Sequence, residues 1–436
     1  MKRAIIYLFL LGCLYSPITL GQTVKCNCID FEIVPISKED TAFTDFKYLV
    51  QVKMNLSVSD IKHDTLLLKT NIKVAQGLEP KNLKAFIIND KQEKTLLPSF
   101  INNITGDQLL NDVQQLSIVL SGHQNSNILI NYDVIGTGFF FYLLEQNYPN
   151  VVAYHPWVEY IYPMDIPIEK VQVKAPDSLL TFCNIKNSSA GIHNGEINLT
   201  FIKKEAFKKE STKWGKVKLN TYIPDSILNN TTYRQEIDKF YLYINKLSAY
   251  IKTPKTLDII LLVWRDAKRR NAFGKSLGNH SIFDIKFPAD GMLHEAIHQA
   301  FPNDVADLSD GEYFIKESIV EWLALSLSGQ LEKIDMTLID TSNVHLYDIH
   351  INNSETWSSI YKLGPAIMQK IATQIGEDIV ASIIVSFFLE KEGKVTTYTE
   401  FIDYLRLHLP LNAIDKLDAL VKGEKTIVLP KLLYGH

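Results

Sequence analysis

Residues His294-Glu295-Ala296-Ile297-His298 form the stretch on which the fold and the chemistry of this chain depend. An α-helix places positions i and i+4 on one face, so the two imidazoles lie one above the other. That arrangement suits a tetrahedral Zn²⁺, whose bonds to histidine nitrogen are about 2.0–2.1 Å long. Glu295 follows the first histidine and can reach an attacking water without being a metal ligand itself.

A catalytic zinc site needs a third protein ligand and an open position. Glu317 follows His298 after eighteen intervening residues and lies in a helical pattern. The complete pattern is expected by chance roughly 0.0007 times in a chain of this composition, on the motif definition. We therefore predict one Zn²⁺ per chain, held by His294, His298 and Glu317. Glu321, one turn further on, is either a solvated helix residue or the acceptor of a zinc-bound histidine N–H.

The rest of the chain divides into two regions by the period of its apolar residues. Between about 31 and 203 they recur mainly at every second position, and turn residues separate the runs at short intervals. This pattern predicts an antiparallel β domain. The lysine-rich stretch 203–213 reads as a solvated connection.

Beyond that connection the pattern becomes mostly helical. Strands are expected at 217–222 and 257–263, flanking a helix at 232–251. Further helices are expected at 291–301, 312–328, 365–390 with a break near Gly376, 398–407 and 413–421. We predict an α+β protein with an N-terminal β domain (22–205), a mostly helical domain (206–395) and a short helical extension (396–436).

Composition excludes several classes of protein. The chain has 436 residues, 46% of them hydrophobic, which is ample for packed cores and rules out general disorder. Its net charge of −4, without long basic runs, argues against nucleic acid as the main partner. After the first residues, no segment is long and apolar enough to predict a transmembrane helix. The oligomeric state stays open.

The N-terminus resembles a secretory signal over residues 1–21. Lys2 and Arg3 precede an apolar stretch at 4–14, and cleavage is expected between Gly21 and Gln22. We predict export to the periplasm, the medium or the cell surface. The alternative is a lipoprotein signal with its anchor at Cys13. The remaining Cys26, Cys28 and Cys183 are odd in number: one of the first two pairs with Cys183, or all three are thiols.

The zinc pattern resembles that of the aminopeptidase-N-type gluzincins, which include leukotriene hydrolase. Residues 294–299 look like the family's His-Glu-x-x-His-Gln, and Lys316-Glu317-Ser318 is similar to its Asn-Glu-Gly. Tyr361-Lys362-Leu363-Gly364 resembles its Tyr-x-Lys-Gly, with Leu363 in place of the lysine. The resemblance implies an N-terminal β saddle, a thermolysin-like zinc domain and a role for Tyr361 in stabilising the oxyanion. It also implies a short form that lacks the family's large helical C-terminal domain.

One departure bears on specificity. The family's aminopeptidases carry Gly-x-Met-Glu-Asn shortly before the zinc helix, and its glutamate holds the substrate's α-amine. The corresponding stretch here, 271–281, contains no Met-Glu-Asn. The sequence therefore predicts an exported zinc metallopeptidase acting on peptide or protein substrates and similar to aminopeptidases, with Glu295 and Tyr361 as catalytic residues. The alternatives are an endopeptidase or other amide hydrolase, and a catalytically silent zinc-containing binding module of the same fold.

Overall fold

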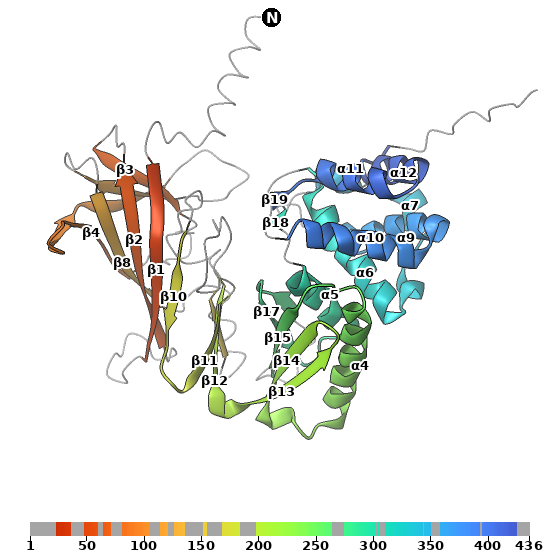
Figure 1. Ribbon diagram of the computed structural model, residues 1–436, viewed down its shortest axis with the longest axis horizontal. Coiled ribbons are helices and arrows are strands. Elements are labelled where there is room, and N and C mark those ends of the chain that lie inside the picture. Colours follow the sequence, from red (N-terminus) through yellow and green to blue (C-terminus); the bar gives the residue numbers. More distant parts are fainter. Residues whose placement is uncertain are drawn as a thin grey trace, which may run out of the picture. The chain divides into compact units, whose positions relative to one another are not determined.

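The computed structural model describes residues 23–35, 48–59, 64–70, 81–103, 114–120, 126–135, 151–154, 168–183, 198–263, 274–301, 304–305, 310–342, 344–349, 358–392 and 395–424. The predicted signal sequence at 1–21, with Cys13, lies outside these residues. The chain forms two compact units, which part between Ala206 and Phe207. Figure 1 shows the elements of each unit.

The N-terminal unit consists of strands that form three sheets. The strands are β1 (Thr23–Pro35), β2 (Tyr48–Ser59), β3 (Thr65–Thr70), β4 (Lys81–Ile88), β5 (Lys94–Leu97), β6 (Ser99–Asn103), β7 (Gln114–Val119), β8 (Ser126–Ile135), β9 (Val151–Tyr154), β10 (Val171–Lys174), β11 (Leu179–Cys183) and β12 (Leu199–Lys203). The sheets have the orders β10-β1-β2-β8-β4-β5, β3-β7-β6 and β11-β12-β9.

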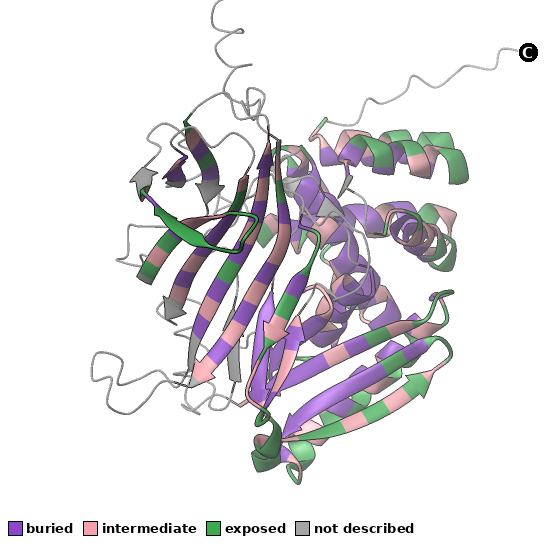
Figure 2. Ribbon diagram, turned by 60° about the vertical axis from the view of Figure 1, so that its left-hand side comes forward, coloured by how far each residue is buried: buried purple, intermediate pink, exposed green. Residues whose placement is uncertain are grey.

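Alternation of side chains explains how these sheets pack. On β2, buried residues at 50, 52, 54, 56 and 58 alternate with more exposed ones. Figure 2 shows such alternating bands of burial along strands of the structure. They share one core with Leu66 and Leu68 of β3 and with Leu116 and Ile118 of β7. The predicted N-terminal β domain is confirmed. It is not wholly antiparallel, because β1 pairs with β10 in parallel.

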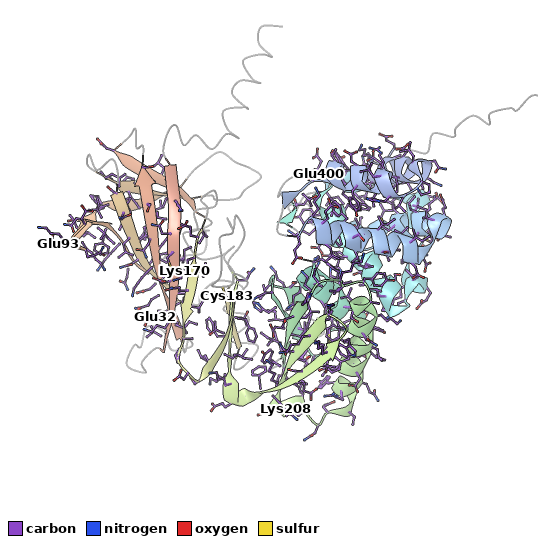
Figure 3. The ribbon with its side chains drawn as sticks, in the orientation of Figure 1. Glu32, Glu93, Lys170, Cys183, Lys208 and Glu400 are labelled. Carbon is purple, nitrogen blue, oxygen red and sulfur yellow. The ribbon has the colours of Figure 1, made fainter. Side chains whose placement is uncertain are left out.

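The first two cysteines of this unit are thiols. Cys26 is buried, and Cys28 donates from Sγ to Asp30 Oδ1 at 3.1 Å, so neither forms the disulfide considered with Cys183. Burial raises the pKa of both thiols to about 12. The surface of the same sheet carries ion pairs, such as that of Lys174 with Glu32, which is labelled in Figure 3.

The C-terminal unit joins a mixed sheet to a layer of helices. The sheet has the order β13-β14-β15-β17-β16, and a two-stranded sheet pairs β18 with β19. The strands are β13 (Phe207–Trp214), β14 (Val217–Pro224), β15 (Lys255–Leu262), β16 (Gly274–Ser276), β17 (His280–Asp284), β18 (Asp304–Val305) and β19 (Val395–Thr396). The helices are α4 (Thr231–Ser248), α5 (Ala289–Ala300), α6 (Ile319–Ser328), α7 (Leu338–Thr341), α9 (Leu363–Ile375), α10 (Glu377–Glu390), α11 (Tyr398–His408) and α12 (Leu411–Val421).

The lysine-rich stretch 203–213 was expected to be a solvated connection, but most of it forms the edge strand β13. Two side chains of β13, Glu210 and Trp214, contact helix α4. Glu210 forms an ion pair with Arg234 of α4 at 2.8 Å, and the centroid of the Trp214 ring lies 5.9 Å from that of Tyr241. Lys208, Lys209 and Lys213 of the strand are exposed. From Glu210 to Trp214, partly buried residues alternate with exposed ones, which is the period of a strand; the number of charged residues in the stretch does not reveal it.

One continuous core holds the helices of this unit together. It contains side chains from the sheet and from α4, α5, α6, α9, α10, α11 and α12. The break predicted near Gly376 is present between α9 and α10, where Gly376 has φ 117°. Helix α11 begins with a capping box in which Thr397 and Glu400 satisfy each other's backbone N–H, and Glu400 is labelled in Figure 3.

Among the described residues, no single helix is long and apolar enough to cross a membrane. The pair Ser358–Ile375 and Glu377–Glu390 passes that test only when taken together, and it is bent by 117°.

Candidate active site

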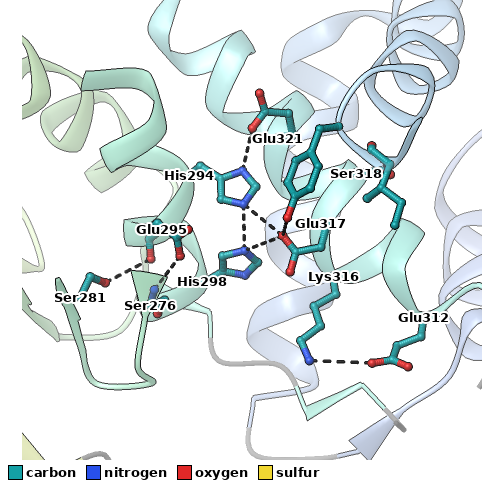
Figure 4. Close-up of polar contacts among 12 residues, drawn as sticks. Ser276, Ser281, His294, Glu295, His298, Glu312, Lys316, Glu317, Ser318 and Glu321 are labelled. Atoms are coloured by element: carbon teal, nitrogen blue, oxygen red, sulfur yellow. Dashed lines mark hydrogen bonds and ion pairs between the residues drawn. The ribbon is translucent and has the colours of Figure 1, made fainter. Parts of the chain in front are cut away.

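Helix α5 carries two rows of functional side chains. Its core face, Met292, Leu293, Ala296, Ile297 and Ala300, is buried and fixes the rotation of the helix. The i, i+4 spacing then aligns His294 with His298 in one row and Glu295 with Gln299 in the next. Figure 4 shows the histidines pointing toward Glu317, while the Glu295 carboxylate points toward Ser276.

Glu317 comes from a π-helical turn, η5 (Phe314–Ser318), that leads into α6. The sequence predicted a continuous α-helix at 312–328, whereas the structure has a π-helical turn before the α-helix begins at Ile319. Such turns insert a residue into a helix and occur frequently at functional sites. Glu317 and Glu321 both reach His294, one at each ring nitrogen.

The donor atoms of His294, His298 and Glu317 form a compact triangle. The Nε2 atoms of the histidines are 3.0 Å apart, and Glu317 Oε2 lies 3.3 Å from His294 Nε2 and 3.5 Å from His298 Nε2. Tetrahedral bonds of about 2.0–2.1 Å require donors about 3.3 Å apart. The triangle therefore has the dimensions of one face of a zinc coordination sphere.

The protonation of His294 supports the same interpretation. Its Nδ1 lies 2.8 Å from Glu321 Oε2, so Nδ1 donates its hydrogen there, and Nε2, which faces Glu317, is left to bind either a proton or a metal ion. A lone pair facing a carboxylate oxygen is stable only if a cation lies between them, either a proton or a metal ion. Burial lowers the pKa of His294, but hydrogen bonds to Glu317 and Glu321 outweigh it and raise that pKa to about 10.

Glu295 is held by the main chain of the neighbouring hairpin. The Ser276 N–H, at the end of strand β16, donates to Glu295 Oε2 at 2.6 Å. Gln299 contacts the same hairpin, donating from Nε2 to the Asn279 carbonyl and accepting from Ser281 Oγ at 3.3 Å. Ser281 Oγ also lies 3.4 Å from the Glu295 carbonyl. The hairpin and α5 are thus joined at several polar points.

Tyr361 lies against the third ligand. Its hydroxyl donates to Glu317 Oε2 at 2.9 Å, and its ring centroid is 5.9 Å from that of His294. Burial, and then the nearby Glu317 carboxylate, raise the pKa of Tyr361 well above its usual range, so the group is a neutral donor.

A close contact between glycine and serine brings Tyr361 to this place. Ser318 Oγ donates to the Ile360 carbonyl at 2.7 Å. A Cβ on Gly364 would lie 2.0 Å from Ser318 Oγ, so only glycine allows α9 to approach this closely. The contact joins residues on either side of Tyr361 to the residue after Glu317.

The structure brings five of the predicted residues into contact: His294, His298, Glu317, Glu321 and Tyr361. Glu295 lies beside His294 on the same helix, with its carboxylate bonded to the Ser276 N–H. Sequence reasoning missed the Ser276 amide, because a backbone donor has no side-chain signal. It also missed the pairing of Ser318 with Gly364, although both lie in the segments already quoted.

Part of the stretch that departs from the gluzincin pattern, residues 271–273, lies outside the described residues. The remainder forms β16, a turn in which Gly278 has φ 81° and Leu277 N donates to His280 O at 2.8 Å, and the start of β17. Residues 274–281 contain no carboxylate.

No protein-family profile and no curated protein match the sequence significantly. An M1 zinc metallopeptidase from Deinococcus radiodurans superposes with a TM-score of 0.54 at 13% identity, covering 94% of this chain and 96% of that one. The fold resembles that of the M1 zinc metallopeptidases.

Two further solved structures agree. Yeast LTA4 hydrolase in complex with bestatin has a TM-score of 0.56 at 14% identity, covering 94% of this chain and 69% of that one. Legionella pneumophila aminopeptidase A in complex with aspartic acid has a TM-score of 0.54 at 12% identity, covering 92% and 51%. At these identities the likeness concerns the fold, and the chemistry has to be argued from the site.

Proposed function

We propose that this protein is a zinc-dependent metallopeptidase, similar to aminopeptidases, that hydrolyses peptide bonds. The observation that carries the proposal is the triangle of His294, His298 and Glu317 donors at 3.0–3.5 Å. The Tyr361 hydroxyl is bonded to Glu317, and Glu295 follows His294 on the same helix. A purely structural zinc site takes four protein ligands, whereas three ligands leave a position open for chemistry. The fold of the M1 zinc metallopeptidases supports the same class.

The residues have distinct tasks in this reaction. His294, His298 and Glu317 would hold a zinc ion, which when bound would supply a Lewis acid for the scissile carbonyl and lower the pKa of water. Glu295 accepts a proton from the attacking water and returns it to the departing amine. Tyr361 is neutral and donates a hydrogen bond to the developing oxyanion. Glu321 keeps the His294 ring in the tautomer that leaves Nε2 for the metal.

The proposal extends to the domain and to the compartment. We assign the C-terminal unit as the thermolysin-like catalytic domain, because it carries every residue of the site. Export rests on Lys2, Arg3 and the apolar stretch 4–14, which have the order of a secretory signal. The mass of the mature chain recovered from the native host tests export, since cleavage after Gly21 removes a defined segment.

The test of the peptidase combines metal content with hydrolysis of a mixed peptide pool. Wild type and Glu295→Gln are compared, with Glu332→Gln as the control because Glu332 is an exposed glutamate on the same unit. We expect one zinc per chain in all three proteins. Cleavage should fall by on the order of 10²–10⁴ only in Glu295→Gln.

The same experiment separates the alternatives. Removal of single N-terminal residues indicates an aminopeptidase, whereas internal cuts indicate an endopeptidase, which the absence of a carboxylate in residues 274–281 favours. One zinc without cleavage by wild type identifies a silent zinc-binding module. Absence of zinc from the purified and zinc-dialysed chain overturns the proposal.

A further inference from the structure

We infer that the β16–β17 hairpin is a positioning element for the general base: the main-chain amide of Ser276 orients the Glu295 carboxylate, and Gln299 fixes the hairpin against α5. The inference rests on the proposed function insofar as Glu295 is a base, but its geometry is tested independently of activity.

The first support is that two adjacent rows of α5 make different contacts. His294 and His298 use one row of the helix for the metal donors, while Glu295 and Gln299 use the adjacent row for the hairpin. Gln299 is almost completely buried, with 5% of its surface exposed. Both ends of its amide are engaged, with the Asn279 carbonyl and with Ser281 Oγ. Because both polar groups of this buried side chain are hydrogen-bonded to the hairpin, Gln299 holds the hairpin against the helix one turn from Glu295.

The second support is the direction of the Ser276 amide. In an antiparallel pair, successive residues direct their N–H groups alternately toward and away from the partner strand. Leu277 N donates inward to the His280 carbonyl at 2.8 Å, so Ser276 N points outward from β17. There it meets Glu295 Oε2 at 2.6 Å. The amide on the outer edge of β16 is therefore bonded to the Glu295 carboxylate.

A packed aromatic ring fixes the other end of β16. A Cβ on Gly274 would lie 2.5 Å from the Phe287 ring, and one on Gly291 would lie 2.7 Å from the same ring. Phe287 thus occupies the space between the strand and the first turns of α5, and stacks on Phe283 at 5.8 Å. The strand has little freedom to move relative to the helix that carries Glu295.

This arrangement gives the base one orientation. A glutamate has three rotatable bonds, and one bond from a main-chain donor to an ionised oxygen is short and strong. Because Oε2 accepts the Ser276 N–H, Oε1 is the oxygen left to accept the proton of the attacking water. Misplacing a reacting group by about 1 Å costs on the order of 10²-fold in rate.

The first experiment measures hydrogen exchange in the zinc-loaded protein, resolved to single amides by fragment-ion mass spectrometry. In Glu295→Ala the Ser276 amide is expected to exchange about 10-fold faster or more, because its acceptor is lost. The Leu277 amide, bonded to His280, is the internal control and should not change. Equal exchange of Ser276 in both proteins overturns the inference, whether or not the protein cleaves peptides.

The second experiment is kinetic. Ser276→Pro removes the N–H at an edge position where proline is tolerated, and Ser276→Ala is the conservative variant that keeps it. We expect Ser276→Pro to lower kcat about 10- to 100-fold with KM within about threefold and full zinc content, and Ser276→Ala to recover the rate. Wild-type kcat in Ser276→Pro overturns the inference, as does an equal loss in both variants.

The two failures are distinguishable. A wild type that cleaves nothing contradicts the proposed function, while the exchange of the Ser276 amide still decides whether the hairpin holds Glu295. If Ser276→Pro does not fold, the same role is tested by Gln299→Leu, which removes both bonds to the hairpin. That variant should lower kcat and speed exchange at Ser276, with zinc retained. Unchanged exchange and kcat in it overturn the inference.

Discussion

The contact between Gly364 and Ser318 provides the sharpest test of how the site is assembled. In Gly364→Ala, the new Cβ would lie 2.0 Å from Ser318 Oγ and 2.2 Å from Ser318 Cβ. Non-bonded carbon atoms pack at about 3.5–4.0 Å. The start of α9 and the π-helical turn must therefore separate by about 1 Å or more.

The magnitude follows from that displacement. Overpacking of this kind costs typically about 1–3 kcal/mol of stability. Tyr361 lies in the segment that moves, and its 2.9 Å bond to Glu317 does not survive a further ~1 Å of separation. Gly364→Ala should therefore lose both stability and the tyrosine contact.

A double-mutant cycle isolates the cause. With Ser318→Gly, the nearest remaining atom to the alanine Cβ would be the Cα at position 318, at 3.3 Å, which a small adjustment accommodates. Ser318→Gly alone costs about 1–2 kcal/mol, from the lost bond to Ile360 and from added backbone freedom. The double variant should be about as stable as Ser318→Gly, giving a coupling of about 1–3 kcal/mol.

The assay is urea unfolding of the metal-free proteins, with the three variants measured beside wild type. A Gly364→Ala midpoint equal to that of wild type would refute the steric argument. So would a double variant whose loss is the sum of the two single losses, since this would show that the two positions do not touch.

Three further predictions concern the site itself. Glu321→Gln should weaken zinc binding about 10- to 100-fold in competition with a chromophoric chelator, because Glu321 orients His294; an unchanged affinity would assign Glu321 to the solvated surface. Tyr361→Phe should lower kcat on the order of 10²–10³-fold with zinc retained, and a rate near that of wild type would remove Tyr361 from the mechanism. In the metal-free protein the folded-state pKa of His294 is raised to about 10, so its contribution to stability is complete below about pH 6.5 and declines up to pH 10. Urea midpoints that stay constant from pH 6.5 to 10 would contradict this assignment, and Tyr361 does not interfere because its pKa lies higher still.

The sequence was informative where local geometry decides the outcome. His294 and His298 lie on one face of α5 because an α-helix imposes that spacing, whatever surrounds it. Glu317 was identified by its distance along the chain from His298. The break at Gly376 was visible because glycine interrupts an otherwise continuous apolar pattern.

The remaining features depend on tertiary contacts, which have no signature in one sequence. Strand β13 was hidden by its lysines, because the residues that define it pack on α4. The π-helical turn at Glu317 has the same composition as an α-helical one. The place of Tyr361 follows from a contact between segments more than forty residues apart, at Ser318 and Gly364.

The two rows of helix α5 also bear on how such a protein changes over evolutionary time. Substitutions in the β16–β17 hairpin leave His294 and His298 untouched, and substitutions on the metal row leave the hairpin contacts of Glu295 and Gln299 in place. The two histidine metal donors and the contacts that hold the base are therefore provided by separate sets of residues on one helix. A lineage can lose the contacts that hold the base by a single change and keep the metal donors intact, without altering the core that folds the unit.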